Sequence, residues 1–316
     1  MFGIDPIIVL FGLGVGILIG LTGIGGGSLM TPLLIIVLGV QPVVAIGTDL
    51  AYSAITKTVG GWRHFHKGTV DMGVARRLGG GGVPGAVLGV LLLDYLQAEY
   101  GKGLDKNLLG FVAAALLLVS IVVLVRAVLL PRLTLGERFT FTFTARTHAA
   151  SIALGFVLGV ILGVTSVGGG ALAGAALLIV FRLTPQRIVG TDVLVAALMT
   201  WAAGLTQVFS GHVDFALMGT ILIGSIPGVW IGTRLMDFVP AHALRVTLGA
   251  VLLGSALAVV EKAGVYVPIG VIFGAPVAVG VLAWGAYRAG LRPPDAAPAH
   301  PPSAIVGGVA FAGDEA

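Results

Sequence analysis

The chain has 316 residues, of which 57% are hydrophobic and 10% are charged, with a formal net charge of +4. Because a water-soluble domain carries about 25% charged residues, this composition excludes an ordinary soluble protein and predicts an all-α, polytopic membrane protein. The absence of cysteine excludes disulfides and thiolate-ligated metal sites, and the confinement of basic residues to short loops argues against a nucleic-acid partner.

Apolar segments of helical length follow one another along the chain. The segment at 27–40 would be about 21 Å long as a helix, which is short of a hydrocarbon core of about 30 Å. We therefore expect such short segments to pair as half-helices inside the membrane, and the sequence leaves open whether 6–40 crosses fully or re-enters. The predicted segments are 6–22, 27–40, 43–62, 72–95 and 107–130, then 148–164, 170–182, 187–208, 215–236 and 243–260, and a last span at 266–288.

The chain contains an internal repeat with an offset of 143 residues. Residues 21–95 align on 164–238 without a gap, and roughly 23 of the 75 aligned positions are identical. A duplication of glycine-interrupted apolar segments is typical of secondary transporters. The recurring motifs include Thr22–Gly27 with Thr165–Gly170, Gly47–Asp49 with Gly190–Asp192, and Gly68–Asp71 with Gly211–Asp214.

Basic residues divide the loops into two sets. When the predicted segments alternate across the membrane, 14 of the 18 Lys and Arg residues fall on one side, which the positive-inside rule makes cytoplasmic. The loop after the third segment is strongly basic, whereas its counterpart at 208–214 holds no Lys or Arg. Five segments in each copy require opposite orientations, so we predict an inverted-topology repeat, with the C-terminus on the cytoplasmic side of an inner membrane.

This layout divides the chain into five parts. Its polar linker lies between the two copies, and the Pro- and Ala-rich composition of the tail predicts disorder. The parts are a first membrane repeat at 1–130, a cytoplasmic linker at 131–147, a second membrane repeat at 148–262, a final transmembrane span at 263–290 and a tail at 291–316.

Three consecutive glycines stand between two apolar runs in each copy. Each glycine destabilises a helix by about 1 kcal/mol relative to alanine, so we expect the helices to open there. The half-helices that follow, from Ser28 and Ala171, would aim their N–H groups at a common centre, which suits an oxyanion. Close helix packing is the alternative explanation. The triplets are Gly25, Gly26 and Gly27 in the first copy and Gly168, Gly169 and Gly170 in the second.

Asp49 and Asp192 each follow Gly-Thr near the start of a long apolar segment. An ionised Asp at membrane depth costs about 2.5–3.5 kcal/mol, so each requires a partner, a cavity or a proton. One interpretation is that they exchange a proton or hold a cation coupled to substrate movement, because a carboxylate beside an anion site must be neutralised. The other is that each caps a half-helix and stays fixed.

Positions where the copies differ are candidates for substrate identity. Lys57 has no counterpart, because Thr occupies position 200. Its side chain either extends to the membrane interface or contacts a substrate anion. The pairs Trp62/Leu205 and His64/Gln207 differ in the same way. In contrast, the glycines at four-residue spacing around Pro84 and Pro227 predict helix packing, and Asp71 and Asp214 are predicted turn or cap residues.

In this order, the motifs Thr-Gly-Ile-Gly-Gly-Gly (22–27), Pro-Val-Val-Ala-Ile-Gly-Thr (42–48), Gly-Thr-Val-Asp (68–71) and Gly-Val-Pro-Gly-Ala-Val-Leu-Gly (82–89) resemble the TauE/SafE sulfite-exporter family, also called the toluenesulfonate uptake permeases. The resemblance covers about residues 6–290. It implies an inner-membrane permease for sulfite, sulfoacetate or other organosulfonate anions. Many members carry Ser after Gly-Thr, whereas this chain has Asp49 and Asp192, so it resembles a distinct branch.

The sequence is therefore interpreted as a proton-coupled, alternating-access transporter of a small sulfur-containing oxyanion, without cofactor or metal. A passive anion channel and a carrier of another small organic anion are the alternatives. An enzyme is not expected, because a serine hydrolase would need a histidine near Ser28 at membrane depth. Lipid and the anion are the expected partners, and a homodimer is compatible with the pattern. Predicted substrate-site side chains are Ser28, Thr48, Thr191 and Lys57, with Asp49 and Asp192 for coupling.

Overall fold

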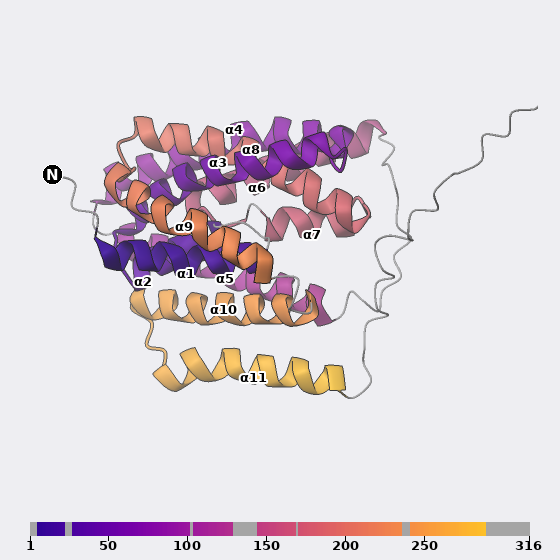
Figure 1. Cartoon of the computed structure of the whole chain (residues 1–316). Coiled ribbons are helices and arrows are strands. Elements are labelled where there is room, and N and C mark those ends of the chain that lie inside the picture. The colour runs from indigo at the N-terminus through magenta and orange to yellow at the C-terminus, as the bar shows by residue number, and fades with distance from the viewer. Residues whose placement is uncertain are drawn as a thin grey trace, which may run out of the picture.

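The computed structural model describes residues 5–22, 27–101, 104–128, 144–168, 170–235 and 241–288. Helices make up nearly all of this part of the chain and run roughly alongside one another (Figure 1). In chain order they are α1 (Pro6–Thr22), α2 (Gly27–Ile36), α3 (Pro42–His66), α4 (Met72–Tyr100), α5 (Leu104–Val128), α6 (Ala145–Thr165), α7 (Ala171–Ile179), α8 (Pro185–Phe209), α9 (Phe215–Leu235), α10 (Ala241–Lys262) and α11 (Ile269–Arg288).

Length and hydropathy make this a multi-pass membrane protein. Within the described residues, five helices are long and apolar enough to cross a membrane, namely 72–100, 104–125, 145–165, 186–209 and 215–235. The shorter apolar helices at 6–21 and 269–282 accompany them. Each of the eleven predicted segments corresponds to one of the helices α1–α11, with ends that differ from the prediction by a few residues. Most of the predicted linker and the whole tail lie outside the described residues.

The second glycine triplet interrupts its helix as predicted. Ser166 ends α6 in the left-handed region, with φ 57°, and its N–H bonds the carbonyl of Leu162 at 2.7 Å. Gly168 and Gly170 have φ values of 128° and 129°, which a residue with a Cβ rarely adopts. The short helix α7 begins at the next residue. In the first copy α1 ends at Thr22 and α2 begins at Gly27; Gly25 and Gly26 lie outside the described residues.

Two pairs of long helices each combine one helix of the first copy with one helix of the second. Helix α1 packs along α9, and α4 packs along α6. A Cβ added at Gly85 would lie 2.2 Å from the Phe156 carbonyl oxygen, and one at Gly228 would lie 2.4 Å from that of Leu13. Since Phe156 and Leu13 are themselves 143 residues apart, the two contacts are equivalent. The packing interpretation of these glycines is confirmed.

Helices α3 and α8 cross antiparallel at the centre of the molecule. Gly204 lies against Ala51, and Gly60 lies against Val193. Near the middle, the indole Nε1 of Trp201 donates to Thr58 Oγ1 at 2.7 Å. Trp201 and Thr58 occupy equivalent positions in the two copies, and equivalent residues can meet only beside the axis that relates them. The repeat is therefore inverted, and its pseudo-twofold axis passes close to this hydrogen bond.

The loop between α3 and α4 contacts the beginning of α8, and the equivalent loop between α8 and α9 contacts the beginning of α3. The backbone N–H of Asp71 donates to Thr191 Oγ1 at 2.9 Å, and that of Asp214 donates to Thr48 Oγ1 at 3.1 Å. Both aspartates also cap helices, because their side chains accept from the N–H groups of Val74 and Leu217. Their predicted role as cap residues is confirmed, and Arg187 adds an ion pair to Asp71 at 3.3 Å.

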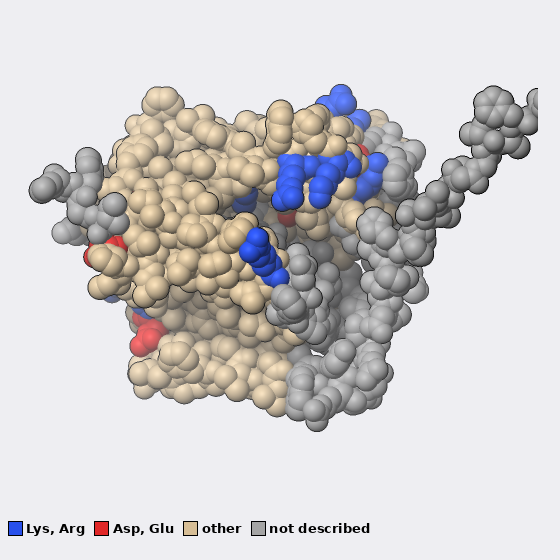
Figure 2. Space-filling model, viewed as in Figure 1, with Lys and Arg blue, Asp and Glu red and all other residues tan. Residues whose placement is uncertain are grey.

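Charge is separated between the two ends of the bundle. Figure 2 shows Lys and Arg side chains gathered toward one end of the visible face and Asp and Glu mainly at the other. We call the first the arginine-rich end. It comprises the helix ends around Arg63, Lys67, Arg76, Arg77, Arg146, Arg182, Arg187 and Arg234. Helix α11 also runs toward this end (Figure 1).

Candidate functional site

Asp49 lies inside the protein, surrounded by hydroxyl groups from three segments. Its side chain is fully buried, at 0% exposure. Oδ2 accepts from Thr31 Oγ1 of α2 at 2.6 Å and from Ser166 Oγ, at the end of α6, at 2.9 Å. Oδ1 accepts from Ser53 Oγ, one turn along α3, at 3.2 Å. The interruption of the second copy therefore meets the carboxylate of the first, and three donors satisfy a group that burial alone would strongly destabilise.

Asp192 has a different environment. It is 8% exposed, and the positions equivalent to the three hydroxyl donors are Gly23, Gly174 and Ala196, none of which can donate from a side chain. Instead Asp192 attracts Lys57 electrostatically, more strongly than Asp49 does. The two copies therefore compensate their buried carboxylates by different means: hydroxyls in the first and a cation in the second.

Lys57 lies within the bundle and does not extend to an interface, because its side chain is 7% exposed. It is one residue from Thr58, whose contact with Trp201 marks the pseudo-twofold axis. Both carboxylates act on its ammonium group. The interface interpretation of Lys57 is therefore wrong. Helix α3 continues for nine residues beyond Lys57, to His66, which is about 13.5 Å along the helix axis. The end of the helix is therefore far from the ammonium group, whereas both carboxylates attract it inside the bundle.

The two aspartates lie at different depths. Gly60 and Gly61 contact Val193 and Leu194, so Asp192 is level with about residue 61 of α3. Twelve residues of helix separate that level from Asp49, which amounts to about 18 Å along the axis. The antiparallel crossing therefore separates the two carboxylates along the bundle. Equivalent residues of an inverted repeat coincide only at its axis, so Asp49 and Asp192 flank Lys57 on opposite sides.

The remaining predicted residues take up varied positions. Ser28 is buried in the first turn of α2, and Gly170 is the N-cap of α7. Thr48 and Thr191 are buried, and their hydroxyl oxygens accept hydrogen bonds from the opposite copy's loop. A role for these residues in substrate binding stays a prediction. Among the described residues, no cluster of His, Asp and Glu could hold a metal ion.

Of the asymmetric pairs, Lys57 and Thr200 lie at the centre, whereas the others do not. Trp62 and Leu205 are 67% and 48% exposed, on the outside of the bundle. His64 contacts Thr69 at 3.0 Å, and Gln207 contacts His212 at 2.9 Å. These two contacts are equivalent and hold the loops at opposite ends. The placement of these two outer pairs therefore does not support a role for them in substrate specificity.

Sequence reasoning did not identify Thr31, Ser53 or Ser166 as partners of Asp49. Ser53 lies four residues after Asp49, which is one helical turn, so helical spacing alone could have indicated it. Thr31 and Ser166 are 18 and 117 residues away. Their only signal is that both are hydroxyl residues beside a glycine interruption, at positions where the other copy has glycine.

Buried polar groups follow one another along the α3–α8 crossing, and we call this series the central path. It runs from Asp49 and its hydroxyl partners to Lys57 and then to Asp192. A buried ammonium attracts anions, and hydroxyl donors can turn from a carboxylate to an oxyanion. Charged groups at this depth, on a bundle of inverted repeats with interrupted helices, define a multi-pass membrane transporter.

The family model described as "Sulfite exporter TauE/SafE" matches residues 8–259. The chain belongs to this family. It is 38% identical over 252 residues to the probable membrane transporter protein YjnA of Bacillus subtilis (strain 168), a match that covers 79% of this chain and 97% of the relative. YdhB of the same organism, also a probable membrane transporter protein, is 26% identical over 231 residues, or 73% and 89% of the two chains. A probable membrane transporter protein of Xylella fastidiosa (strain Temecula1) is 27% identical over 265 residues, or 82% and 97%. No solved structure matches this chain.

Proposed function

We propose that this protein is a secondary active transporter that moves a small sulfur-containing oxyanion, such as sulfite or sulfoacetate, together with protons across the inner membrane. The family description supports the sulfur-containing oxyanion, and the arginine-rich end supports a cytoplasmic C-terminus by the positive-inside rule. The observation that carries the proposal is the placement of Lys57 at the pseudo-twofold axis between two buried carboxylates.

Lys57 is the group that attracts the anion in this mechanism. In the absence of substrate, the carboxylates of Asp49 and Asp192 attract its ammonium group from opposite sides. An incoming oxyanion repels both carboxylates, so it binds well only when one of them takes up a proton. Proton and anion therefore enter together, and Lys57 changes its partner from a carboxylate to the substrate.

The hydroxyl shell of Asp49 would complete this exchange. An ionised Asp49 uses hydrogen bonds from Thr31, Ser53 and Ser166. A protonated Asp49 needs fewer donors, which releases hydroxyls to the substrate oxygens. Thr31 and Ser166 belong to different copies, so movement of one copy against the other would break their shared contact with Asp49. Alternating access would then expose Asp49 toward one side and Asp192 toward the other.

The test is flux of labelled sulfite into phospholipid vesicles that contain the purified protein. The wild type should accumulate sulfite when an inward proton gradient is imposed and should exchange it in counterflow. Asp49→Asn and Asp192→Asn should lose gradient-driven accumulation while they keep some counterflow. Asp105→Asn, which removes a carboxylate from the first turn of α5, is the matched control and should behave as wild type.

Three outcomes would contradict the proposal. Gradient-driven flux that is unchanged in both Asn variants would remove the coupling role. Flux without saturation or counterflow would indicate a passive anion channel. In competition among sulfite, sulfoacetate, taurine, sulfate, phosphate and a sulfur-free carboxylate, preference for the carboxylate would overturn the substrate class and favour a carrier of another organic anion.

A further inference from the structure

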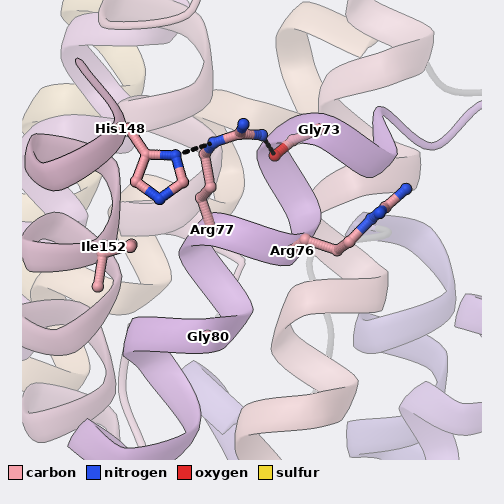
Figure 3. A pocket seen from close by; sticks show the side chains of 6 residues that line it. All are labelled: Gly73, Arg76, Arg77, Gly80, His148 and Ile152. Atoms are coloured by element: carbon pink, nitrogen blue, oxygen red, sulfur yellow. Dashed lines mark hydrogen bonds between the residues drawn. The ribbon is translucent and has the colours of Figure 1, made fainter. Parts of the chain in front are cut away.

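A second polar site lies on the surface of the bundle, away from the central path. Between the first turns of α4 and the second turn of α6, at the arginine-rich end, the protein forms a pocket of about 450 Å³ (Figure 3). Its lining comprises Gly73, Arg76, Arg77, Gly80, His148 and Ile152. A Cβ at Gly80 would meet open space, so the missing side chain at this position contributes to the volume of the pocket.

The polar side chains of the pocket are two arginines and a histidine. Arg77 Nε donates to His148 Nδ1 at 2.9 Å, and Arg77 Nη1 donates to the Gly73 carbonyl at 2.7 Å (Figure 3). Because His148 Nδ1 accepts, Nε2 carries the proton and remains a donor. Arg76 is exposed and makes no hydrogen bond or ion pair with the described residues. The lining contains two arginines and no carboxylate, so basic side chains predominate in it.

The internal repeat provides a control for this charge. Helices α1 and α9 form the equivalent pair at the opposite end of the bundle. There the four α4 lining positions correspond to Ala216, Gly219, Thr220 and Ile223, and the two α6 positions correspond to Asp5 and Val9. The equivalent surface therefore has no basic residue and includes one acid. Helix pairing does not require the arginines, because the same pairing is made without them.

The depth of the pocket matches the headgroup region of a bilayer. Arg76 and Arg77 follow the first residue of α4 by four and five positions, about 6–8 Å along the helix. Ile152, which is 37% exposed, lines the same pocket from the side of the apolar bundle surface. Arg76 and Arg77 extend from α4 in different directions (Figure 3). A guanidinium group suits phosphate oxygens, and basic pockets between membrane helices on the cytoplasmic side bind anionic headgroups.

We propose that this α4–α6 pocket binds the phosphate headgroup of an anionic phospholipid from the leaflet at the arginine-rich end. Arg77 and His148 Nε2 donate to the phosphate, Arg76 adds positive charge to the pocket, and an acyl chain follows the apolar surface beside Ile152. This site is separate from the transport path and does not depend on the transported substrate.

The experiment is lipid titration of the full-length protein in neutral detergent, followed by native mass spectrometry and thermal unfolding. The wild type should bind phosphatidylglycerol about tenfold more tightly than phosphatidylcholine, which has the same phosphodiester without net charge. Arg76→Gln combined with Arg77→Gln should lower that preference to the level of phosphatidylcholine. Arg76→Gln alone, at a residue without structural partners, and Gly80→Leu, which fills the pocket and keeps its charge, should each lower it severalfold.

Arg63→Gln combined with Lys67→Gln is the matched control, because it removes two basic residues from the same end but outside the pocket. It should leave the preference unchanged within about twofold. Equal losses in this control would show that general surface charge attracts the lipid, which overturns the site. Full competition by glycerol 3-phosphate would identify a free-anion site, and a Gly80→Leu protein that retains the preference would show that the lipid binds elsewhere.

Discussion

The helix pairs α1–α9 and α4–α6 are built from equivalent contacts, whereas the polar residues along α3 and α8 are not equivalent. Gly85 lies against a carbonyl of α6 just as Gly228 lies against a carbonyl of α1. Asp49, in contrast, accepts from three hydroxyls, while the equivalent positions around Asp192 are Gly23, Gly174 and Ala196.

This difference separates two kinds of constraint on a duplicated chain. A glycine that supports a backbone contact cannot change in either copy, since any added Cβ meets a carbonyl. A buried carboxylate can be compensated by hydroxyls or by a cation, so its surroundings are free to diverge. The two copies therefore have the same helix packing but different polar groups around their buried carboxylates. The charges around the pseudo-twofold axis are therefore asymmetric, because Lys57 interacts with the carboxylates of both copies and has no equivalent in the second copy.

The largest effect is expected from the packing glycines. Gly85→Leu and Gly228→Leu each force a side chain against backbone, with the first atom within 2.2–2.4 Å of a carbonyl oxygen. Overpacking of this kind costs about 3 kcal/mol or more, so neither variant should yield monodisperse protein in size-exclusion chromatography of detergent extracts. Gly219→Leu, where nothing lies within 4 Å, should behave as wild type. Survival of one variant alone would break the equivalence of the helix pairs.

The central positions should respond unequally. Lys57→Met leaves Asp49 and Asp192 buried without their cation, which costs several kcal/mol, and it removes the group that attracts the anion. Sulfite flux should fall about 100-fold. Thr200→Val, at the equivalent position, removes a hydroxyl that bonds only the backbone of its own helix in the described structure and should change flux less than about twofold. Comparable losses in both variants would show that the axis, and not the charge of Lys57, is required.

Sequence patterns predicted the elements of this fold well because they depend on local physics. Apolar runs bounded by Pro42 and Pro185 indicated where α3 and α8 begin, since Pro favours the first turn of a helix. The triplet at Gly168–Gly170 predicted an interrupted helix, and its backbone angles supply the reason. The inverted orientation followed from the odd number of segments in each copy, and the loop charges agreed with it; neither depends on a distance between residues.

What sequence could not give was the relation between positions in different copies. The depth of Asp49 relative to Asp192 depends on where α3 and α8 cross, and that crossing is set by contacts such as Thr58 with Trp201. Likewise Ser166 reaches Asp49 from 117 residues away. Helical periodicity relates residues within one segment only, so neither the axis nor the contacts made across it were readable from a single chain.

The hydroxyl donors around Asp49 have no counterpart around Asp192. Thr31→Val and Ser166→Ala each remove a donor to Asp49. A lost hydrogen bond to a charged group costs about 1.5–3 kcal/mol, so each variant should alter the apparent sulfite affinity by roughly tenfold or more in the vesicle assay. Thr220→Val, whose exposed hydroxyl bonds its own helix, is the control. Unchanged affinity in both variants would separate Asp49 from the substrate.

The smallest effects are expected at Thr48 and Thr191, which accept equivalent hydrogen bonds from the opposite copy's loop. Thr48→Val and Thr191→Val keep the volume of the side chain and remove one acceptor each, so each should cost about 1 kcal/mol and lower the unfolding temperature in detergent by a few degrees. The shifts should differ in a definite order. The N–H lost at Asp71 is buried, whereas Asp214 is exposed and water can replace Thr48 there. Thr191→Val should therefore be the more destabilising, and the reverse order would mean that the loop at Asp214 is the tighter of the two contacts between copies.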